Sequence, residues 1–440
     1  MKTTVFLLFL ALVTSAAAWG ADNKSGLQTY ALQSARHRGD LDRVQVLLEV
    51  GGELKFKPGV QKAEPVKMTV AARLAYHEKL IQRASRQDRV TRAIRYYEDA
   101  TAELKIGDKE FRPALRQQRR LVAVSVDRGG PVLFSPAGSL MREEVDLIDV
   151  PGCSALVDQL LPDRAVAPGD RWKHEDQLMA GLLGLEEVRQ NSAQTVLDSV
   201  VDGIARMQLS GHVEGVVDGA ATQIELKGKY HFDTQTKRII WFGLLIKENR
   251  EPGDVASGLD VVARLQMQIA TLEQSEQLTE AKLQGLSLEP TPQRTQLIHR
   301  SADPAWHMTH DRSWYLTADD PVLVIFQLLD QGQRIAQCNI SPRARGKGVT
   351  LEQFQDQIRS SLDKHFGQFV EAGESINPSQ CHVLRVVVRG EVSDLPIQWY
   401  YYLVSNDQGR QVVFTFTVAN ESISRFDAAD QKLVRTFGFD

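Results

Sequence analysis

The sequence predicts an α+β protein in which an antiparallel β-rich N-terminal domain, a half-barrel or a sandwich, precedes an α/β/α sandwich. Three observations support this class. Apolar residues alternate with polar ones through most of residues 21–272, a segment rich in Glu, Gln, Thr and Pro fills 273–305, and residues 306–440 mix strand-like runs with amphipathic stretches. The chain has 440 residues, which is too long for one compact core, so we expect two or three domains.

The first twenty residues predict a secretory signal peptide. Lys2 supplies a positive start, residues 5–13 are apolar, and small residues precede the expected cleavage point near Ala18 or Gly20. We therefore expect an exported protein, periplasmic or extracellular. No later segment offers about twenty apolar residues, so we expect no membrane-spanning segment in the mature chain.

Composition and charge narrow the function classes. The chain is 42% hydrophobic and 25% charged, and its formal net charge is -4, which gives no reason to expect nucleic acid as a partner. Three cysteines are too few for a disulfide-dense scaffold. Cys338 and Cys381 either pair between strands or are, with Cys153, buried small apolar residues.

The β-rich region shows period-two alternation with turn signals between its runs. One example places five residues on one face: Met68, Val70, Ala72, Leu74 and Tyr76. Asp202-Gly203 and Asp218-Gly219 are hairpin turns in this interpretation. A short helix is expected at about 153–160. The residues before Asp146 either belong to the same sheet or form a small domain of their own.

Residues 273–305 predict a domain boundary. A short helix is expected at about 275–286, and Pro290 and Pro292 then favour a linker, because proline fits neither a sheet interior nor a helix interior. Domain boundaries commonly fall in such segments, and relative motion of the two domains is the default expectation.

The C-terminal domain can be divided into elements almost residue by residue. Strands are expected at 312–317, 322–329, 334–340, 369–375, 382–392, 397–405 and 411–418. A helix is expected at 350–369, because six apolar residues recur at steps of three and four: Leu351, Phe354, Ile358, Leu362, Phe366 and Phe369. A second amphipathic helix is expected at 426–437.

Several stretches of this domain resemble the PsbP-like family, which includes exported bacterial DcrB-type proteins. The residues that carry the resemblance are 397–404, the turn 406–409, 412–418 and 426–437. The resemblance implies an α/β/α sandwich and an accessory or scaffolding role. In the N-terminal region, residues 161–172 around Pro168-Gly169 resemble exported bacterial β half-barrel domains related to lipoprotein carriers.

Two groups of residues are candidates for ligand or partner contact. Trp399 and Tyr401 share one face of a strand, and Tyr400 and Tyr402 share the other. Core packing on both faces is favoured, but a face that no helix covers would form a binding surface. Arg345 and Lys347 precede a helix and could contact an anion or a partner. There Thr350 is expected to be the N-cap, with Gln353 at the capping-box position.

No catalytic constellation and no cofactor motif is recognised. His307 and His310 are weak metal-ligand candidates, and stray surface histidines are the favoured interpretation. We therefore expect an exported, non-catalytic binding or scaffolding protein that recognises a protein or an envelope component. The alternative is a carrier of a lipid or other apolar ligand in the concave face of the N-terminal sheet. A metal-dependent enzyme is the third hypothesis.

Overall fold

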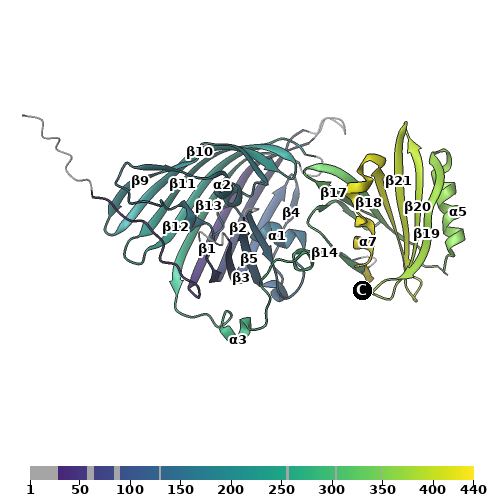
Figure 1. Cartoon of the computed structure of the whole chain (residues 1–440), viewed down its shortest axis with the longest axis horizontal. Coiled ribbons are helices and arrows are strands. Elements are labelled where there is room, and N and C mark those ends of the chain that lie inside the picture. Colours follow the sequence, from purple (N-terminus) through teal and green to yellow (C-terminus); the bar gives the residue numbers. More distant parts are fainter. Residues whose placement is uncertain are drawn as a thin grey trace, which may run out of the picture.

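The computed structural model describes residues 28–56, 64–83, 90–127, 130–253, 257–302, 305–346 and 348–440. The expected signal peptide, with its cleavage point near Ala18 or Gly20, lies outside these residues. Within them, no helix is both long and apolar enough to cross a membrane. Figure 1 shows the chain as a large curved sheet on one side and a smaller sheet with flanking helices on the other.

The predicted α+β class is wrong, because the protein is mostly β. Strands account for 56% of the chain and helices for only 15%, and the strands form antiparallel sheets of 13, 3 and 7 strands. The large N-terminal set is one sheet rather than two packed sheets, so the sandwich alternative is also wrong. The cause is that the strands are longer, and the helices shorter, than the apolar patterns in the sequence suggested.

The large sheet runs in the order β6-β5-β3-β2-β1-β13-β12-β11-β10-β9-β7, with β4 beside β3 and β8 beside β10. Its strands are β1 (Leu41–Lys55), β2 (Val66–Gln82), β3 (Thr91–Ile106), β4 (Lys109–Phe111), β5 (Leu121–Asp127), β6 (Gly130–Phe134), β7 (Arg171–Lys173), β8 (Glu187–Asn191), β9 (Gln194–Val201), β10 (Ile204–Val217), β11 (Ala220–Asp233), β12 (Arg238–Arg250) and β13 (Gly258–Leu272). Because β1 pairs with β13 along its whole length, the residues before Asp146 belong to this same sheet.

Two predicted hairpin turns are confirmed. Asp202 and Gly203 join β9 to β10 with φ of 52° and 77°, and Asp218 and Gly219 join β10 to β11 with φ of 48° and 73°. Positive φ at both central residues is the backbone of a type I′ turn, which Asp-Gly accommodates well. These turns fix the register of β9, β10 and β11.

The segment between β6 and β8, apart from the short strand β7, packs against one face of the large sheet. It contains α1 (Arg142–Ile148), the 3-10 turn η2 (Val157–Leu160) and α2 (Asp176–Leu183). The helix expected at 153–160 thus forms only from Val157 onward. Buried residues of this segment, such as Ile148, Leu156 and Met179, share one core with the sheet. In Figure 1, α1 and α2 lie in the hollow of the curved sheet.

The C-terminal part is built on a seven-stranded sheet in the order β16-β17-β18-β22-β21-β20-β19, next to the three-stranded sheet β14-β15-β23. Its strands are β14 (Leu297–Ala302), β15 (Ala305–His310), β16 (Trp314–Asp320), β17 (Leu323–Asp330), β18 (Gln333–Arg343), β19 (Phe366–Ile376), β20 (His382–Val392), β21 (Leu395–Ser405), β22 (Gln411–Ala419) and β23 (Gly438–Phe439). All seven strands that the sequence predicted in this domain are present. The edges of the larger sheet are β16 and β19.

The helices of this part are shorter than predicted. The helix expected at 350–369 ends as α5 (Leu351–Leu362), where Asp363 has a φ of 46°. Phe366 and Phe369 lie in β19 instead, with ring centroids 4.9 Å apart. The other helical segments are η1 (Gln117–Arg119), α3 (Glu280–Leu283), α4 (Pro292–Thr295), η3 (Asp363–His365), η4 (Asn420–Ser422), α6 (Ile423–Phe426) and α7 (Ala429–Val434).

The helix expected at 426–437 is divided because Asp427 and Ala428 both have positive φ, 42° and 54°, between α6 and α7. The N-cap of α5 is as predicted: the Thr350 hydroxyl accepts a hydrogen bond from the Gln353 backbone N–H, and the Gln353 side-chain oxygen accepts one from the Thr350 backbone N–H. Apolar side chains of α5 pack on one face of the seven-stranded sheet, and Phe426 and Leu433 pack on the other.

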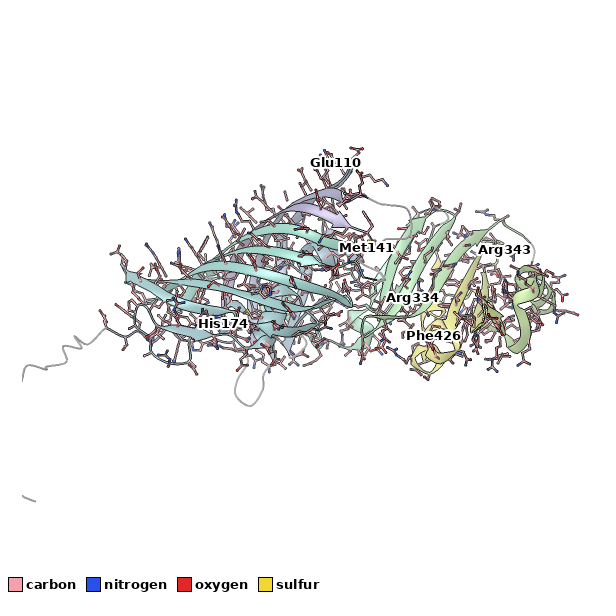
Figure 2. The ribbon with its side chains drawn as sticks, turned by 90° about the horizontal axis from the view of Figure 1, so that it is seen from above. Glu110, Met141, His174, Arg334, Arg343 and Phe426 are labelled. Carbon is pink, nitrogen blue, oxygen red and sulfur yellow. The ribbon has the colours of Figure 1, made fainter. Side chains whose placement is uncertain are left out.

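The predicted linker at 273–305 contains structure of its own. Strand β14 pairs with β15, and Leu297 is fully buried in the core of the large sheet, where it bridges Leu140. The two parts also touch elsewhere: the Tyr315 hydroxyl donates to Asp218 at 2.7 Å. In Figure 2 the parts lie side by side, with Met141 near their junction.

Candidate functional site

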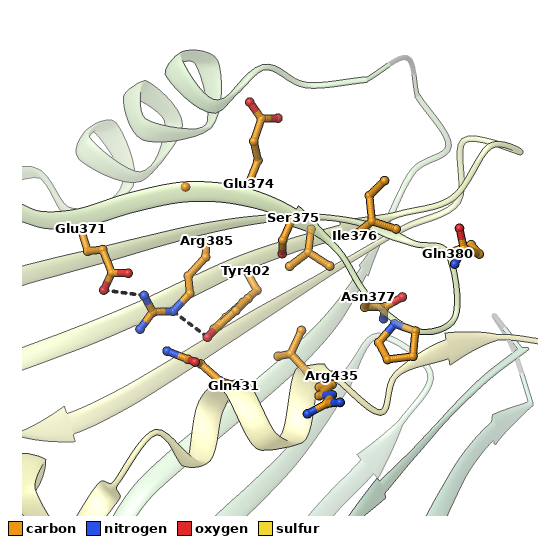
Figure 3. A pocket seen from close by; sticks show the side chains of 14 residues that line it. Glu371, Glu374, Ser375, Ile376, Asn377, Gln380, Arg385, Tyr402, Gln431 and Arg435 are labelled. Atoms are coloured by element: carbon orange, nitrogen blue, oxygen red, sulfur yellow. Dashed lines mark hydrogen bonds and ion pairs between the residues drawn. The ribbon is translucent and has the colours of Figure 1, made fainter.

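The main cavity of the C-terminal part is a groove of about 890 Å³ beside the edge strand β19. Gly373 and Ser375 of β19, Arg385 of β20 and Tyr402 of β21 line its sheet side, and α7 lines the opposite side (Figure 3). We call this cavity the β19 groove. Its lining residues are Glu371, Gly373, Glu374, Ser375, Ile376, Asn377, Pro378, Gln380, Val383, Arg385, Tyr402, Gln431, Val434 and Arg435.

The groove exists because the short helices cover only part of the sheet. Helix α6 packs mainly against β18 and β22, and α7 mainly against β15, so neither helix has its main contacts with β19. The β19 residues that point to this face are small at Gly373 and Ser375. A sheet face that no helix covers and that bears small side chains leaves room for a ligand or a partner segment.

Arg385 is the centre of a charged network on the groove wall. Its guanidinium group lies 2.6 Å from Glu371 Oε2 and 3.2 Å from Asp430 Oδ2, and it donates to the Tyr402 hydroxyl at 2.8 Å. Tyr402 in turn donates to Asp430 Oδ2 at 2.5 Å. Each nitrogen of the guanidinium thus has an acceptor within reach, which orients the Arg385 side chain on the groove wall.

Two groups of the network, Tyr402 and Arg385, keep their protons near neutral pH. Burial and the adjacent carboxylate of Asp430 raise the pKa of Tyr402 far above its usual range, so the phenol keeps its proton. Burial alone would lower the pKa of Arg385, but Tyr402, Glu371 and Asp430 outweigh it and raise that pKa. A phenol and a guanidinium held in this way can bind and orient a ligand. Neither is suited to exchange protons with a substrate at neutral pH.

Arg435 differs from the other charged residues of the groove. It stands on α7 one turn after Gln431, and the structure gives it no ion pair anywhere in the described part of the chain. Its side chain is exposed. The β19 groove therefore contains one guanidinium whose charge no neighbouring carboxylate balances.

The predicted aromatic set divides between the two faces of the sheet. Trp399 packs with Phe354 of α5, and Tyr401 adjoins the same cluster. Tyr400 is buried on the other face, 5.1 Å from the Phe426 ring between centroids. Of the four residues, only Tyr402 lines the groove. The predicted alternation of faces is confirmed, and core packing accounts for the first three.

The basic pair Arg345 and Lys347 does not belong to the groove. Arg345 is exposed in the loop before α5 and is not a lining residue. Lys347 lies outside the described residues. The structure therefore does not bring this predicted contact to the same place as Tyr402.

His307 and His310 do not converge on a metal ion. Both lie in β15, where residues three apart point to opposite faces. His307 is 2.6 Å from Asp440 through Nδ1, whereas His310 is buried and donates from Nδ1 to the Asp311 carbonyl at 2.9 Å. Burial lowers the pKa of His310 to about 4. Across the described residues, no group of three potential ligands forms a metal site.

The three cysteines are free and buried. Cys338 and Cys381 therefore do not pair, and the interpretation of Cys153, Cys338 and Cys381 as buried small residues is the one that fits the structure.

Sequence reasoning missed most of the β19 groove. Glu371, Arg385 and Gln431 belong to three different elements, β19, β20 and α7, and no spacing in the sequence links them. One signal was available: Arg385 interrupts an otherwise apolar strand, between Leu384 and Val386. A charge at such a position needs a buried partner, which here is Asp430 of α7.

A second feature lies on the core-bearing face of the large sheet. The residues Ala263, Val50, Val70, Leu104 and Phe111 are cross-strand neighbours on β13, β1, β2, β3 and β4. We call this row the apolar strip. Ala263 is 9% exposed, and Phe111 at the other end is 46% exposed. A cavity of about 570 Å³ beside it is lined in part by Leu48, Ala72 and Ala102.

Comparison with known proteins gives little further guidance. No family model and no curated protein matches the chain. Among solved structures, a lipovitellin structure titled for lipid-protein interactions matches 55% of this chain and 26% of its own, with 9% identity and a TM-score of 0.30.

Two further matches are bacterial. The translocator domain of the autotransporter NalP from Neisseria meningitidis shows 8% identity and a TM-score of 0.14, over 88% of this chain and 90% of its own. A Salmonella typhi OmpF complex with daunomycin shows 9% identity and a TM-score of 0.14, over 87% and 97%. The matched region spans about a quarter of lipovitellin, and at these TM-scores none of the likenesses supports an argument about function. The resemblance of the C-terminal part to PsbP-like proteins stays a prediction.

Proposed function

We propose that this protein is an exported, non-catalytic binding protein and that a protein or envelope component docks in the β19 groove. The observation that carries the proposal is the groove itself, an opening of about 890 Å³ over a sheet face that the short helices leave uncovered. Ligand sites of proteins are commonly concave and of about 300–1,000 Å³. The exposed Arg435, which has no ion pair among the described residues, supplies a polar contact within it.

The side chains of the groove favour binding over catalysis. The phenol of Tyr402 keeps its proton, and Arg385 is fully engaged by Glu371, Tyr402 and Asp430. Val383 and Val434 add apolar surface between these polar groups. A mixture of apolar floor and a few oriented polar groups is what recognition of a partner requires.

A photo-crosslinking residue placed at Gln431 is expected to capture a partner of defined mass in the cells that make this protein. The matched control places the same residue at Lys432, which lies on the same helix outside the groove lining and pairs with Asp427. In a second variant, Ser375→Trp fills the groove from the exposed edge strand and should abolish the Gln431 crosslink. Equal crosslinking from both positions, or a crosslink that survives Ser375→Trp, would contradict the proposal.

A second candidate function rests on the apolar strip. Phe111 and its neighbours Leu104 and Val70 present apolar side chains that grow more exposed toward β4. Such a strip beside a cavity suits an acyl chain or another apolar ligand. In this case the N-terminal sheet would be a carrier, and the β19 groove would serve a separate contact.

Native mass spectrometry of the mature protein, followed by organic extraction, tests the carrier function. We expect a bound lipid or acyl compound that is lost in a Leu104→Glu variant, because a charge in the strip opposes an apolar ligand. Val262→Glu is the matched control, since Val262 is 46% exposed on the opposite face of β13. Protein that carries no extractable ligand, or retains it in Leu104→Glu, would leave this function without support.

A further inference from the structure

Strand β19 is an open edge of the seven-stranded sheet. It extends from Phe366 to Ile376 and pairs only with β20, so its outer backbone groups face no other strand in the sheet. Its side chains are exposed at most positions, including Ile376 at 67%. An edge of this kind can accept another extended chain through backbone hydrogen bonds.

The two halves of β19 differ in regularity. Register shifts lie between Phe366 and Gln368 and between Phe369 and Glu371, whereas Ala372 to Ile376 pair with β20 without interruption. Bulges twist an edge and hinder the addition of a strand. The second half is therefore the part that can accept a partner strand.

The β19 groove follows this regular half. Its lining includes four consecutive residues of β19, Gly373 to Ile376. Alternate residues of a strand point to opposite faces, so side chains on one face alone could not account for four in succession. The backbone of the strand is thus exposed to the groove, and a chain that pairs with the edge would also reach Arg435.

The charges of the groove indicate which partner fits. Glu371 lies 2.6 Å from Arg385, and Glu374, on the other side of β19, lies 3.0 Å from His382 (Figure 3). Both carboxylates thus have a basic neighbour already. The guanidinium of Arg435 is the charged group of the lining that has no ion pair within the described residues.

We propose that the partner bound in the β19 groove is an extended acidic segment of a protein, which pairs with residues 372–376 of β19 and places a carboxylate against Arg435. The inference rests on the proposed function, because it names the partner class of the same groove. Backbone pairing supplies sequence-independent affinity, and the carboxylate supplies selectivity.

A library of linear eight-residue peptides, displayed on phage and selected against the full mature protein, tests this partner class. Enriched peptides should carry Asp or Glu at one fixed position, flanked by residues that favour strands. Synthetic versions of these peptides should bind on the order of tenfold more weakly to the Arg435→Glu variant. A peptide in which the acidic residue is changed from Asp to Asn should lose a similar factor, as expected for a lost charge-assisted hydrogen bond. Lys432→Glu, the same charge change on α7 outside the groove lining, should leave the affinity unchanged.

Hydrogen exchange of the complex shows whether the peptide adds as a strand. The amides of residues 372–376 that point away from β20 should become protected when the peptide binds. A proline at the centre of the peptide should abolish both protection and binding, because proline cannot donate to the ladder.

The outcomes separate this inference from the proposed function. Peptides that bind without an acidic preference, or without protecting the β19 amides, would overturn the inference of an acidic extended partner. A crosslink from Gln431 would in that case still support docking of a partner in the β19 groove. Peptides whose binding survives Ser375→Trp, together with no crosslink from Gln431, would overturn both. A selection that enriches no peptide would overturn the inference alone if the Gln431 crosslink forms.

Discussion

Replacing Glu78 with Gln is expected to destabilise the N-terminal part by about 3–5 kcal/mol, the cost of removing one member of a buried charge network. Glu78 is fully buried in β2 and lies between two guanidinium groups, 2.6 Å from Arg36 and 2.7 Å from Arg95. Ser154 also donates to it, at 2.7 Å. The glutamine would retain some hydrogen bonds but would leave the charge of Arg95 without a carboxylate.

The location of the network explains why the effect should be large. Arg36 comes from the segment before β1, Arg95 from β3 and Ser154 from the segment that fills the hollow of the sheet. Arg36 also pairs with Asp42 at 2.8 Å. Glu78 therefore joins three separate chain segments, and the loss of its charge should loosen the attachment of all three.

Urea denaturation followed by fluorescence measures this loss as a lower midpoint at an unchanged slope. The matched control is Glu98→Gln, because Glu98 pairs with Arg43 at 3.3 Å on the exposed face, where the side chains are 38% and 51% exposed. Exposed pairs contribute about 0–1 kcal/mol. Similar losses in the two variants would show that the buried network does not behave as a buried charge cluster.

The same carboxylate predicts how stability depends on pH. Burial alone would raise the pKa of Glu78, but Arg95 and Arg36 outweigh it and lower the pKa to about 2. The folded-state pKa thus lies below the unfolded value, so the stabilisation is present above about pH 4.5 and is lost as the pH falls toward 2. Glu78→Gln should lack this component, and its stability should fall less steeply across that range than that of the unchanged protein.

Local patterns in the sequence predicted the strands well. Asp202-Gly203 and Asp218-Gly219 specify their hairpins through backbone conformation alone, and alternation along Met68 to Tyr76 marks the core face of β2. These signals depend on neighbours within a few residues. They stay valid whatever the rest of the chain does.

The fold class was predicted wrongly where a short run of apolar residues fits the spacing of a helix but forms a strand. Steps of three and four include Phe366 and Phe369, but Asp363 turns the chain and both residues enter β19. The pattern of apolar residues cannot show such a turn, because Asp363 is not a residue that marks a helix end strongly. The single large sheet was also out of reach, since it depends on the pairing of β1 with β13, more than 200 residues apart in sequence.

The candidate site was predicted only through Tyr402. The strand pattern placed Tyr400 and Tyr402 on one face, and the structure shows that a helix element covers the first and leaves the second beside the groove. Which part of a sheet a helix covers depends on helix length and position, here on the break between α6 and α7 at Asp427. Arg435 and Glu371 meet at the groove through this tertiary arrangement, which no local spacing encodes.

Asp430→Asn is the second change expected to have a large effect, a loss of about 3 kcal/mol in the C-terminal part. Asp430 is fully buried in α7, and its Oδ2 accepts from Tyr402 at 2.5 Å and lies 3.2 Å from the Arg385 guanidinium. The neutral amide would keep the volume but leave Arg385 with only Glu371, whose side chain is 62% exposed.

Thermal unfolding of Asp430→Asn beside Asp427→Asn isolates the effect of burial, since Asp427 pairs with Lys432 on the surface with 83% of its side chain exposed. Asp427→Asn should cost less than about 1 kcal/mol. Because Asp430 attaches α7 to β20 and β21 through Arg385 and Tyr402, its replacement should also displace Gln431 and Arg435 and weaken whatever the β19 groove binds. A variant that unfolds like Asp427→Asn and binds normally would show that this attachment does not hold the groove wall in place.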